Sequence, residues 1–435
     1  MNRQRPNFEK KELALSSTRY VYLPEDIPVY TVEVSHREEI DGDLLQRALD
    51  RTAKRMPYLA DTLTLDGAKV YYAKNPLPMS AGHREGPRPV GGAETNYHLL
   101  DLTWNGNRTW FSMFHGFCDG QGISVFLESV VFHYYCMKDG VEYEPCGIRT
   151  DRDEMTEAEV FEPLSKSYEV SPGYVMPESG EMPALYHIPE ISLNPGREIR
   201  EYGFSVPSDA FMHFVKQNGT SPAVMISMLV GEAIRRVHPD ADGLIRAVIP
   251  ASIRRMLGCE ETFKNCFAKM ELPIHGTPLD DLPFDQRAAR LRTMLKEQMD
   301  PDRLRMRYNM LRDRYTKRVE EAGDYREELR KPPTDMTMSK DTYYVDYIGT
   351  LHKTAYADQM TDIRFLNMPG LGKNLHLNII EHCGAFRIAC LACSDITPLM
   401  DALLQVMQDH GLPVQRLAEN RFTLPLAIWR EGLNF

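Results

Sequence analysis

The sequence lacks any run of about 18 apolar residues, the length that a membrane-spanning helix requires. Its first residues, MNRQRPNFEKKELAL, contain no apolar core of the kind found in a secretion signal. Cysteine is also sparse, with 8 residues scattered over 435 positions. This usage fits free thiols in a reducing compartment better than a disulfide framework. We therefore expect a cytoplasmic protein with no membrane span.

Positive charge is in deficit, because the formal net charge is −11 at pH 7. A nucleic-acid-binding protein normally carries a basic domain or stripe, so this balance argues against a nucleic-acid partner. An anionic ligand would need a local cluster of cations.

Several common site motifs are absent or incomplete. There is no G-x-S-x-G nucleophile elbow. Cys390 and Cys393 form a single C-x-x-C with no further pair to complete a zinc site, so we interpret both as core residues and expect no metal. His382-Cys383 lacks an orienting base, and 370–373 (GLGK) lacks the rest of a phosphate-binding loop, so we expect a turn there.

The length predicts two domains or two equivalent halves, since a single core rarely serves more than about 300 residues. The stretch 163–195 holds six prolines and no periodicity, as expected of a surface connection. We place an N-terminal half at 1–165, the connection at 166–195 and a C-terminal half at 196–435. Both halves open with a strand followed by a helix.

The first half can be read in some detail. Residues 29–34 (VYTVEV) have strand composition, and the helical spacing of apolar residues over 43–56 predicts a helix after an N-cap near Asp41. Asp66-Gly67 and Asn105-Gly106 mark hairpin turns.

The most informative stretch is 114–122 (FHGFCDGQG), which joins the end of an apolar strand to a helix. A histidine on such a turn is held by the backbone and can take and return a proton near neutral pH. Strand alternation places Phe114 and His115 on opposite faces. Spacing alone leaves two interpretations open, a structural His115–Asp119 pair and a catalytic one.

This run resembles the H-H-x-x-x-D-G motif of the chloramphenicol-acetyltransferase-like superfamily, which includes condensation domains and alcohol O-acetyltransferases. The resemblance extends over nearly the whole chain. Phe114 stands where the motif has its first histidine, and His115 matches the second, which is the catalytic one in the family. Further matching segments are 44–59, 250–255 (PASIRR), 262–265 (TFKN), 347–349 (YIG), 378–381 (NIIE) and 384–386 (GAF).

The resemblance implies an α/β fold of two halves, each a mixed sheet flanked by helices, around a central tunnel. It implies acyl transfer from a thioester to a hydroxyl or amine, with His115 as general base. The co-substrate would be acyl-coenzyme A or the phosphopantetheine arm of an acyl or peptidyl carrier protein, and no cofactor would be bound. The acceptor would be a small molecule of secondary metabolism.

The same resemblance assigns roles to the neighbouring residues. Asp119 would be an orienting, structural residue, paired with an arginine for which Arg254 is the candidate. Gly120 would permit the backbone turn of the loop.

Between residues 303 and 318 there are seven basic residues and one acid, Asp313. One interpretation is a solvated helix face. The other is a binding surface for the phosphates of the donor or for an acidic carrier protein, with Arg303, Arg307 and Arg314 on one helix face.

Two other function classes remain open at this point. The protein could be a catalytically inactive, condensation-domain-like scaffold that binds a carrier protein or ligand, which the presence of Phe114 favours. It could also be an enzyme whose chemistry lies away from His115.

Overall fold

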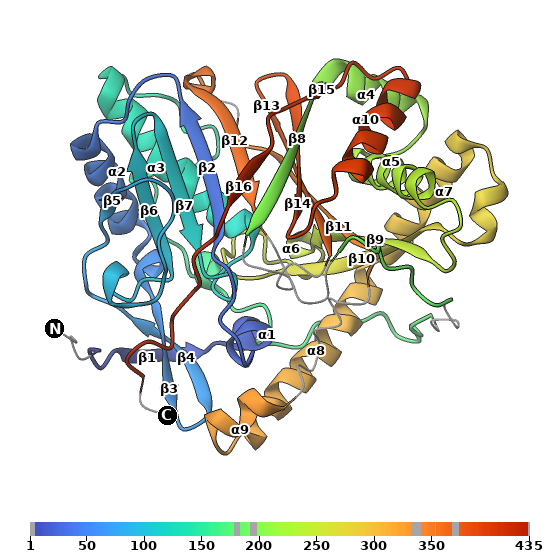
Figure 1. Ribbon diagram of the computed structural model, residues 1–435. Helices are drawn as coiled ribbons and strands as arrows, with labels where there is room; N and C mark the ends of the chain where they lie inside the picture. The colour runs from blue at the N-terminus through green and yellow to red at the C-terminus, as the bar shows by residue number, and fades with distance from the viewer. Residues whose placement is uncertain are drawn as a thin grey trace.

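The structure is a computed structural model that describes residues 5–177, 183–191, 198–331, 341–352, 354–367 and 374–433. Two α/β halves lie side by side, the earlier one at the left of Figure 1 and the later one at the right. The predicted turn at 370–373 and parts of the predicted connection, 178–182 and 192–195, lie outside the described residues. No described helix combines the length and apolarity needed to cross a bilayer.

The first half is built on a five-stranded sheet in the order β12-β2-β7-β6-β5. Its strands are β2 (Tyr30–His36), β5 (Ala81–His83), β6 (Leu100–Asn105), β7 (Arg108–Met113) and β12 (Met360–Leu366). Helices α2 (Gly42–Arg55) and α3 (Gly120–Asp139) pack together beside this sheet (Figure 1). A smaller sheet contains β1 (Glu9–Leu13), β4 (Lys69–Lys74) and β3 (Thr62–Asp66).

The sequence correctly predicted β2 and α2, but not β1 and α1 (Thr18–Val21), which precede them. Asp41 is the N-cap of α2, where its side chain accepts hydrogen bonds from the backbone N–H groups of Asp43 and Leu44, both at 3.0 Å. Gly67 has a left-handed φ of 58°, which the β3–β4 turn requires.

The second half is an eight-stranded mixed sheet in the order β10-β9-β11-β13-β14-β8-β15, with β16 also paired to β8. Its strands are β8 (Ile199–Pro207), β9 (Ile245–Ser252), β10 (Phe267–His275), β11 (Tyr343–Thr350), β13 (Leu375–His382), β14 (Ala385–Ala392), β15 (Gln415–Arg416) and β16 (Asn420–Phe422). Strand β11 runs parallel to both β9 and β13.

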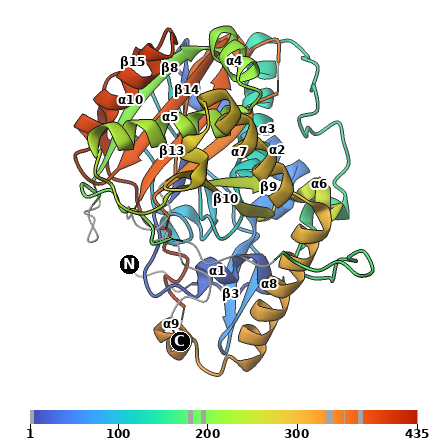
Figure 2. The same cartoon turned by 90° about the vertical axis from the view of Figure 1, so that its right-hand side faces the viewer.

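Helices cover the outer face of this second sheet, as Figure 2 shows. They are α4 (Ser208–Gln217), α5 (Pro222–Val237), α7 (Phe284–Gln298) and α10 (Thr397–Asp409). The remaining described helices are α1 (Thr18–Val21), α6 (Arg254–Leu257), α8 (Pro301–Glu321) and α9 (Tyr325–Arg330).

The division of the chain at residues 166–195 does not fully separate the two sheets. Strand β12, from the later part of the chain, pairs antiparallel with β2 of the first sheet (Figure 1). Trp429 is also buried in the core of the first half. Residues beyond 196 therefore complete the first half, and the two halves are joined by shared structure.

Candidate functional site

His115 lies between β7 and α3, two residues after the strand ends. Its backbone carbonyl accepts a hydrogen bond from Asn265 Nδ2 at 2.9 Å, and the Gly116 carbonyl accepts one from the Ser17 hydroxyl. The loop is thus held from both halves through its backbone.

The His115 ring is fixed in a definite orientation and tautomer. Nδ1 lies 3.2 Å from the Cys118 carbonyl oxygen, which can only accept, so Nδ1 carries the hydrogen. Tyr20 stacks on the ring at 4.8 Å, and Tyr30 meets it edge-on at 5.6 Å. Nε2 makes no hydrogen bond to a described residue, so its lone pair is available.

The half-buried His115 lines a cavity of about 570 Å³ between the two halves. The first half contributes α1, the segment 23–30 and the start of α3. The second half contributes β9, β10, β11 and β13. Polar residues lining the cavity include Arg19, Glu25, Gln121, Ser124, Glu128, Ser252, Lys269, Asp346, Asn367 and His376. A molecule in this cavity can therefore contact His115 and groups from both sheets.

Burial is the main influence on the pKa of His115 and lowers it, because the imidazolium form loses hydration. The negative charges of Asp119 and Asp346 act in the opposite direction, and the positive charge of Arg19 lowers the pKa further. The outcome is a pKa below the ordinary histidine value, which favours the neutral ring that a general base needs.

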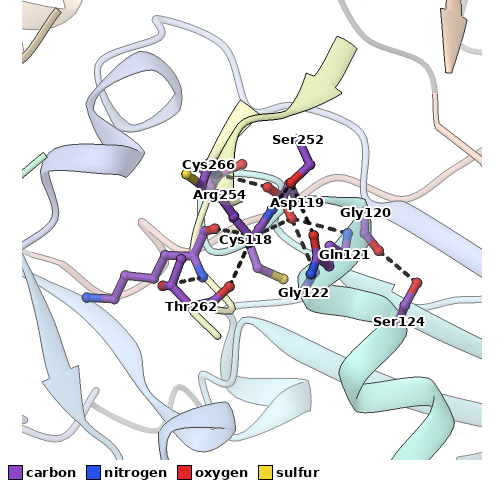
Figure 3. Close-up of polar contacts among 12 residues, drawn as sticks. Cys118, Asp119, Gly120, Gln121, Gly122, Ser124, Ser252, Arg254, Thr262 and Cys266 are labelled. Atoms are coloured by element: carbon purple, nitrogen blue, oxygen red, sulfur yellow. Dashed lines mark hydrogen bonds and ion pairs between the residues drawn. The ribbon is translucent and has the colours of Figure 1, made fainter. Parts of the chain in front are cut away.

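Asp119 is buried in a network of hydrogen bonds, drawn in Figure 3. Oδ1 accepts from Arg254 Nη2 at 2.8 Å and from the backbone N–H groups of Gln121 and Gly122, and so caps α3. Oδ2 accepts from the Cys266 N–H at 2.9 Å. The carboxylate thereby connects the loop and α3 of the first half to the second half.

Arg254 is equally well bonded. Its guanidinium donates to the carbonyls of Thr262 and Lys264 at 2.8 and 2.7 Å, besides its ion pair with Asp119 (Figure 3). Strand β9 ends at Ser252, so Arg254 begins the short helix α6 and reaches across to the loop. The structure thus brings together the Asp119 and Arg254 that the sequence analysis had matched.

The expectation for Gly120 needs correction. Its φ is not left-handed, and an added Cβ would meet only the Tyr30 hydroxyl at an ordinary 3.5 Å. Gly122 is the crowded position, since a Cβ there would lie 2.3 Å from the Phe263 carbonyl oxygen and 2.5 Å from the Cys118 Cβ. The close approach of α3 to the second half therefore requires glycine at 122.

Phe114 occupies the opposite face of the chain from His115. Its side chain is buried, packs edge-on against Tyr20 and contacts Trp429, and it does not line the cavity. A residue at this position contributes to the core of the first half.

Arg303, Arg307 and Arg314 lie on α8 and are not among the residues that line the cavity. The structure does not bring them together with His115. Other cations of α8 are bonded to neighbouring segments, as Arg305 is to the Met256 carbonyl and Arg318 to Glu328. A donor-binding role for the three arginines remains a prediction.

The cysteine-containing motifs fall in different settings. Cys390 is buried in the core of the second half, and Cys393 is half-buried beyond the end of β14. Cys383 is exposed, and its Sγ lies 3.2 Å from His382 Nε2. Across the parts of the chain that the structure describes, no cluster of three or more His, Cys, Asp or Glu side chains could hold a metal ion.

The sequence analysis did not select Asp346 and His376, which face the same cavity and are hydrogen-bonded to one another at 2.9 Å. Asp346 directly precedes the Y-I-G segment, on a strand where Tyr344 and Asp346 share a face by alternation. Its position next to this matching segment could have identified Asp346 from the sequence. Identifying His376 on β13 as its partner needed the strand order of the sheet.

No protein-family model matches the sequence, and no curated protein matches it. Solved structures do match its fold. The TRI101 protein of F. sporotrichioides, solved with coenzyme A and T-2, has 11% identity and a TM-score of 0.60, covering 95% of this chain and 100% of that one. The TRI3 trichothecene 15-O-acetyltransferase from Fusarium sporotrichioides has 10% identity and a TM-score of 0.56, covering 92% and 94%.

A third similar structure is the epimerization domain from the third module of tyrocidine synthetase B. It has 12% identity and a TM-score of 0.53, and the match covers 94% of this chain and 98% of that one. The chain therefore has the two-lobed chloramphenicol-acetyltransferase-like fold, and the fold class implied by the sequence resemblance is confirmed.

Proposed function

We propose that this protein is an acyltransferase that moves an acyl group from a thioester, acyl-coenzyme A or a carrier-bound phosphopantetheine, to a hydroxyl or amine. The observation that carries the proposal is the His115 imidazole, whose Nδ1 is tied to the Cys118 carbonyl while Nε2 keeps its lone pair beside the cavity. Likeness of fold to a coenzyme A complex and to an acetyltransferase supports it.

The proposed reaction needs one proton carrier. His115 Nε2 removes the proton of the acceptor's hydroxyl or amine as that atom attacks the thioester carbonyl carbon. The tetrahedral intermediate then expels the thiolate, the C–S bond breaks, and the proton passes from the imidazolium to sulfur. No covalent bond to the protein forms. Asp119 does not touch the reacting atoms in this scheme and positions the loop.

A direct assay tests the proposal. The protein is mixed with acetyl-coenzyme A and a panel of alcohols and amines, thiol release is followed, and the product is identified by mass spectrometry. Acceptor-dependent release with an acetylated product is the expected result. The assay is repeated with a carrier-bound thioester as the donor. If thiol release is seen with no acceptor and with neither donor, the hypothesis of an inactive scaffold, which Phe114 favours, becomes the better one.

The pH dependence of the reaction follows from the environment of His115. Burial lowers its pKa, so the ring stays neutral at pH values below the ordinary histidine pKa of about 6.5. We expect the acid limb of the kcat/KM profile to lie below about pH 6.5, with activity lost as the pH falls through the lowered pKa. An acid limb above that value would contradict a buried neutral base.

Charge reversal on α8 tests whether this helix attracts the donor. Coenzyme A carries its phosphates at the end remote from the thiol, so cations that bind them need not line the cavity. Replacing Arg303, Arg307 and Arg314 with Glu is expected to raise the KM of acetyl-coenzyme A by about tenfold at low salt, since exposed ion pairs contribute up to about 1 kcal/mol each. The effect should shrink at high salt, and the acceptor KM should not change.

Helix α7 offers a control of equal charge change. This helix covers the outer face of the second sheet (Figure 2), and its cations Arg290, Arg292 and Lys296 do not line the cavity. If charge reversal on α7 raises the KM of acetyl-coenzyme A as much as charge reversal on α8 does, the rise in KM comes from the net charge of the protein. An unchanged donor KM in the α8 variant would mark that segment as a solvated helix face.

A further inference from the structure

Asp346 is a carboxylate of β11 that lines the cavity together with His115. Its Oδ2 accepts hydrogen bonds from His376 Nε2 at 2.9 Å and from Asn367 Nδ2 at 3.2 Å. Its Oδ1 accepts none from any described residue. Because a carboxylate can accept about four hydrogen bonds, Asp346 retains capacity for a further donor.

The side chain is held in place by its surroundings. His376 is buried, and its ring lies parallel to that of Tyr344 at 5.8 Å with an interplanar angle of 8°. Strands β11 and β13, which carry Asp346 and His376, are hydrogen-bonded neighbours. The Asp346 side chain lines the cavity and keeps 15% exposure, although its Oδ1 atom is itself buried.

The charge of Asp346 is not balanced by a strong cation. Among the described residues its ion pair is with His376, and no arginine or lysine lies within ion-pair distance. By contrast, the carboxylate of the buried Asp119 accepts hydrogen bonds from Arg254 and from three backbone N–H groups. An incompletely bonded carboxylate in a partly enclosed cavity favours a charged donor from the ligand.

We propose that Asp346 is a specificity-determining residue that binds a protonated amine of the acceptor, at a position other than the group that is acylated. The inference rests on the proposed acyl transfer and names the class of acceptor, a molecule that carries a reacting hydroxyl or amine and a second, cationic nitrogen. Because Oδ1 is buried, the amine would bind at the exposed part of the carboxylate, whose acceptor capacity His376 and Asn367 do not exhaust.

The test compares acceptors that differ only in this nitrogen. Dimethylamino-alcohols of graded chain length are protonated at neutral pH and have no acylatable nitrogen. Each is paired with the alcohol in which a CH group replaces the N–H⁺, and acetyl-coenzyme A is the donor. We expect wild-type kcat/KM to be about tenfold or more higher for the amine of the best pair, as a charge-assisted hydrogen bond predicts.

Asp346→Asn keeps the shape of the side chain and removes its charge, so it should abolish the preference for the amine. Asp280→Asn is the matched control, because Asp280 accepts from His275 at 2.9 Å but lies outside the cavity. That variant should keep the preference. Equal rates for both members of every pair in the wild type, or an undiminished preference in Asp346→Asn, would overturn the proposal.

A binding measurement separates this proposal from the proposed function. Calorimetric titration of the wild type and Asp346→Asn with the dimethylamino-alcohols needs no acyl donor. If no acceptor is acylated, acyl transfer fails, but tighter binding of the amine to the wild type would still support the role of Asp346. Equal affinity for the two proteins, or no binding to the wild type, would reject it.

Discussion

Replacing His115 with alanine is expected to lower kcat/KM for acyl transfer by about 10²–10⁴-fold, the usual contribution of a general base. The substitution should slow the chemical step, since Nε2 carries the lone pair that is available to take the acceptor's proton. Stability should change little. The loop is held by the backbone bonds of Asn265 and Ser17, which the substitution leaves in place.

Steady-state kinetics together with thermal melting of the same preparations check this expectation. His410→Ala is a suitable control, because His410 pairs with Glu232 at 2.9 Å on the outer side of the second half and does not line the cavity. It should retain full activity. A His115→Ala protein that folds normally and keeps most of its activity would show that another group takes the proton.

The second large effect is expected from the Asp119–Arg254 pair. Arg254→Met would leave a buried carboxylate without its cation, a change that typically costs about 3–5 kcal/mol of folding free energy. It would also remove the donors to the Thr262 and Lys264 carbonyls. Activity should fall with stability, because the same carboxylate positions the loop that carries His115.

Asp119→Ala tests the pair from the other side. It should lower the melting temperature and activity together, since α3 loses its N-cap and the Cys266 N–H loses its acceptor. Urea unfolding of both single variants and the double variant would measure their coupling, which should be well above zero for groups 2.8 Å apart. Loss of activity in Asp119→Ala with unchanged stability would instead place Asp119 in the chemistry.

Much of the loop around His115 could be read from local sequence. Phe114 and His115 follow the end of β7, and the opposite faces predicted for them match the structure, in which Phe114 is buried in the core and His115 lines the cavity. The role expected of Gly120 could not be judged from local sequence. Which glycine of the D-G-Q-G segment is sterically required depends on the Phe263 carbonyl, which lies far away in the chain and close in space.

The partners of the site residues were harder to predict. Arg254 could be matched to Asp119 only through the family resemblance, because 135 positions separate them. Asp346 and His376 were missed, since their pairing arises from the neighbouring positions of β11 and β13 in the sheet. Local patterns carry no information about strand order.

The length, turn residues and hydrophobic periodicity of the sequence predicted two halves, and the family resemblance carried by a motif of short span predicted the fold class and pointed to the His115 loop. Tertiary packing alone brings β12 into the first sheet, joins Asp119 to Arg254 across the halves, and places Asp346 beside the cavity. Periodicity and turn propensity act over a few neighbouring residues. Hydrogen bonds and ion pairs across the halves depend instead on how separate strands pack, and many alternative packings share the same local patterns.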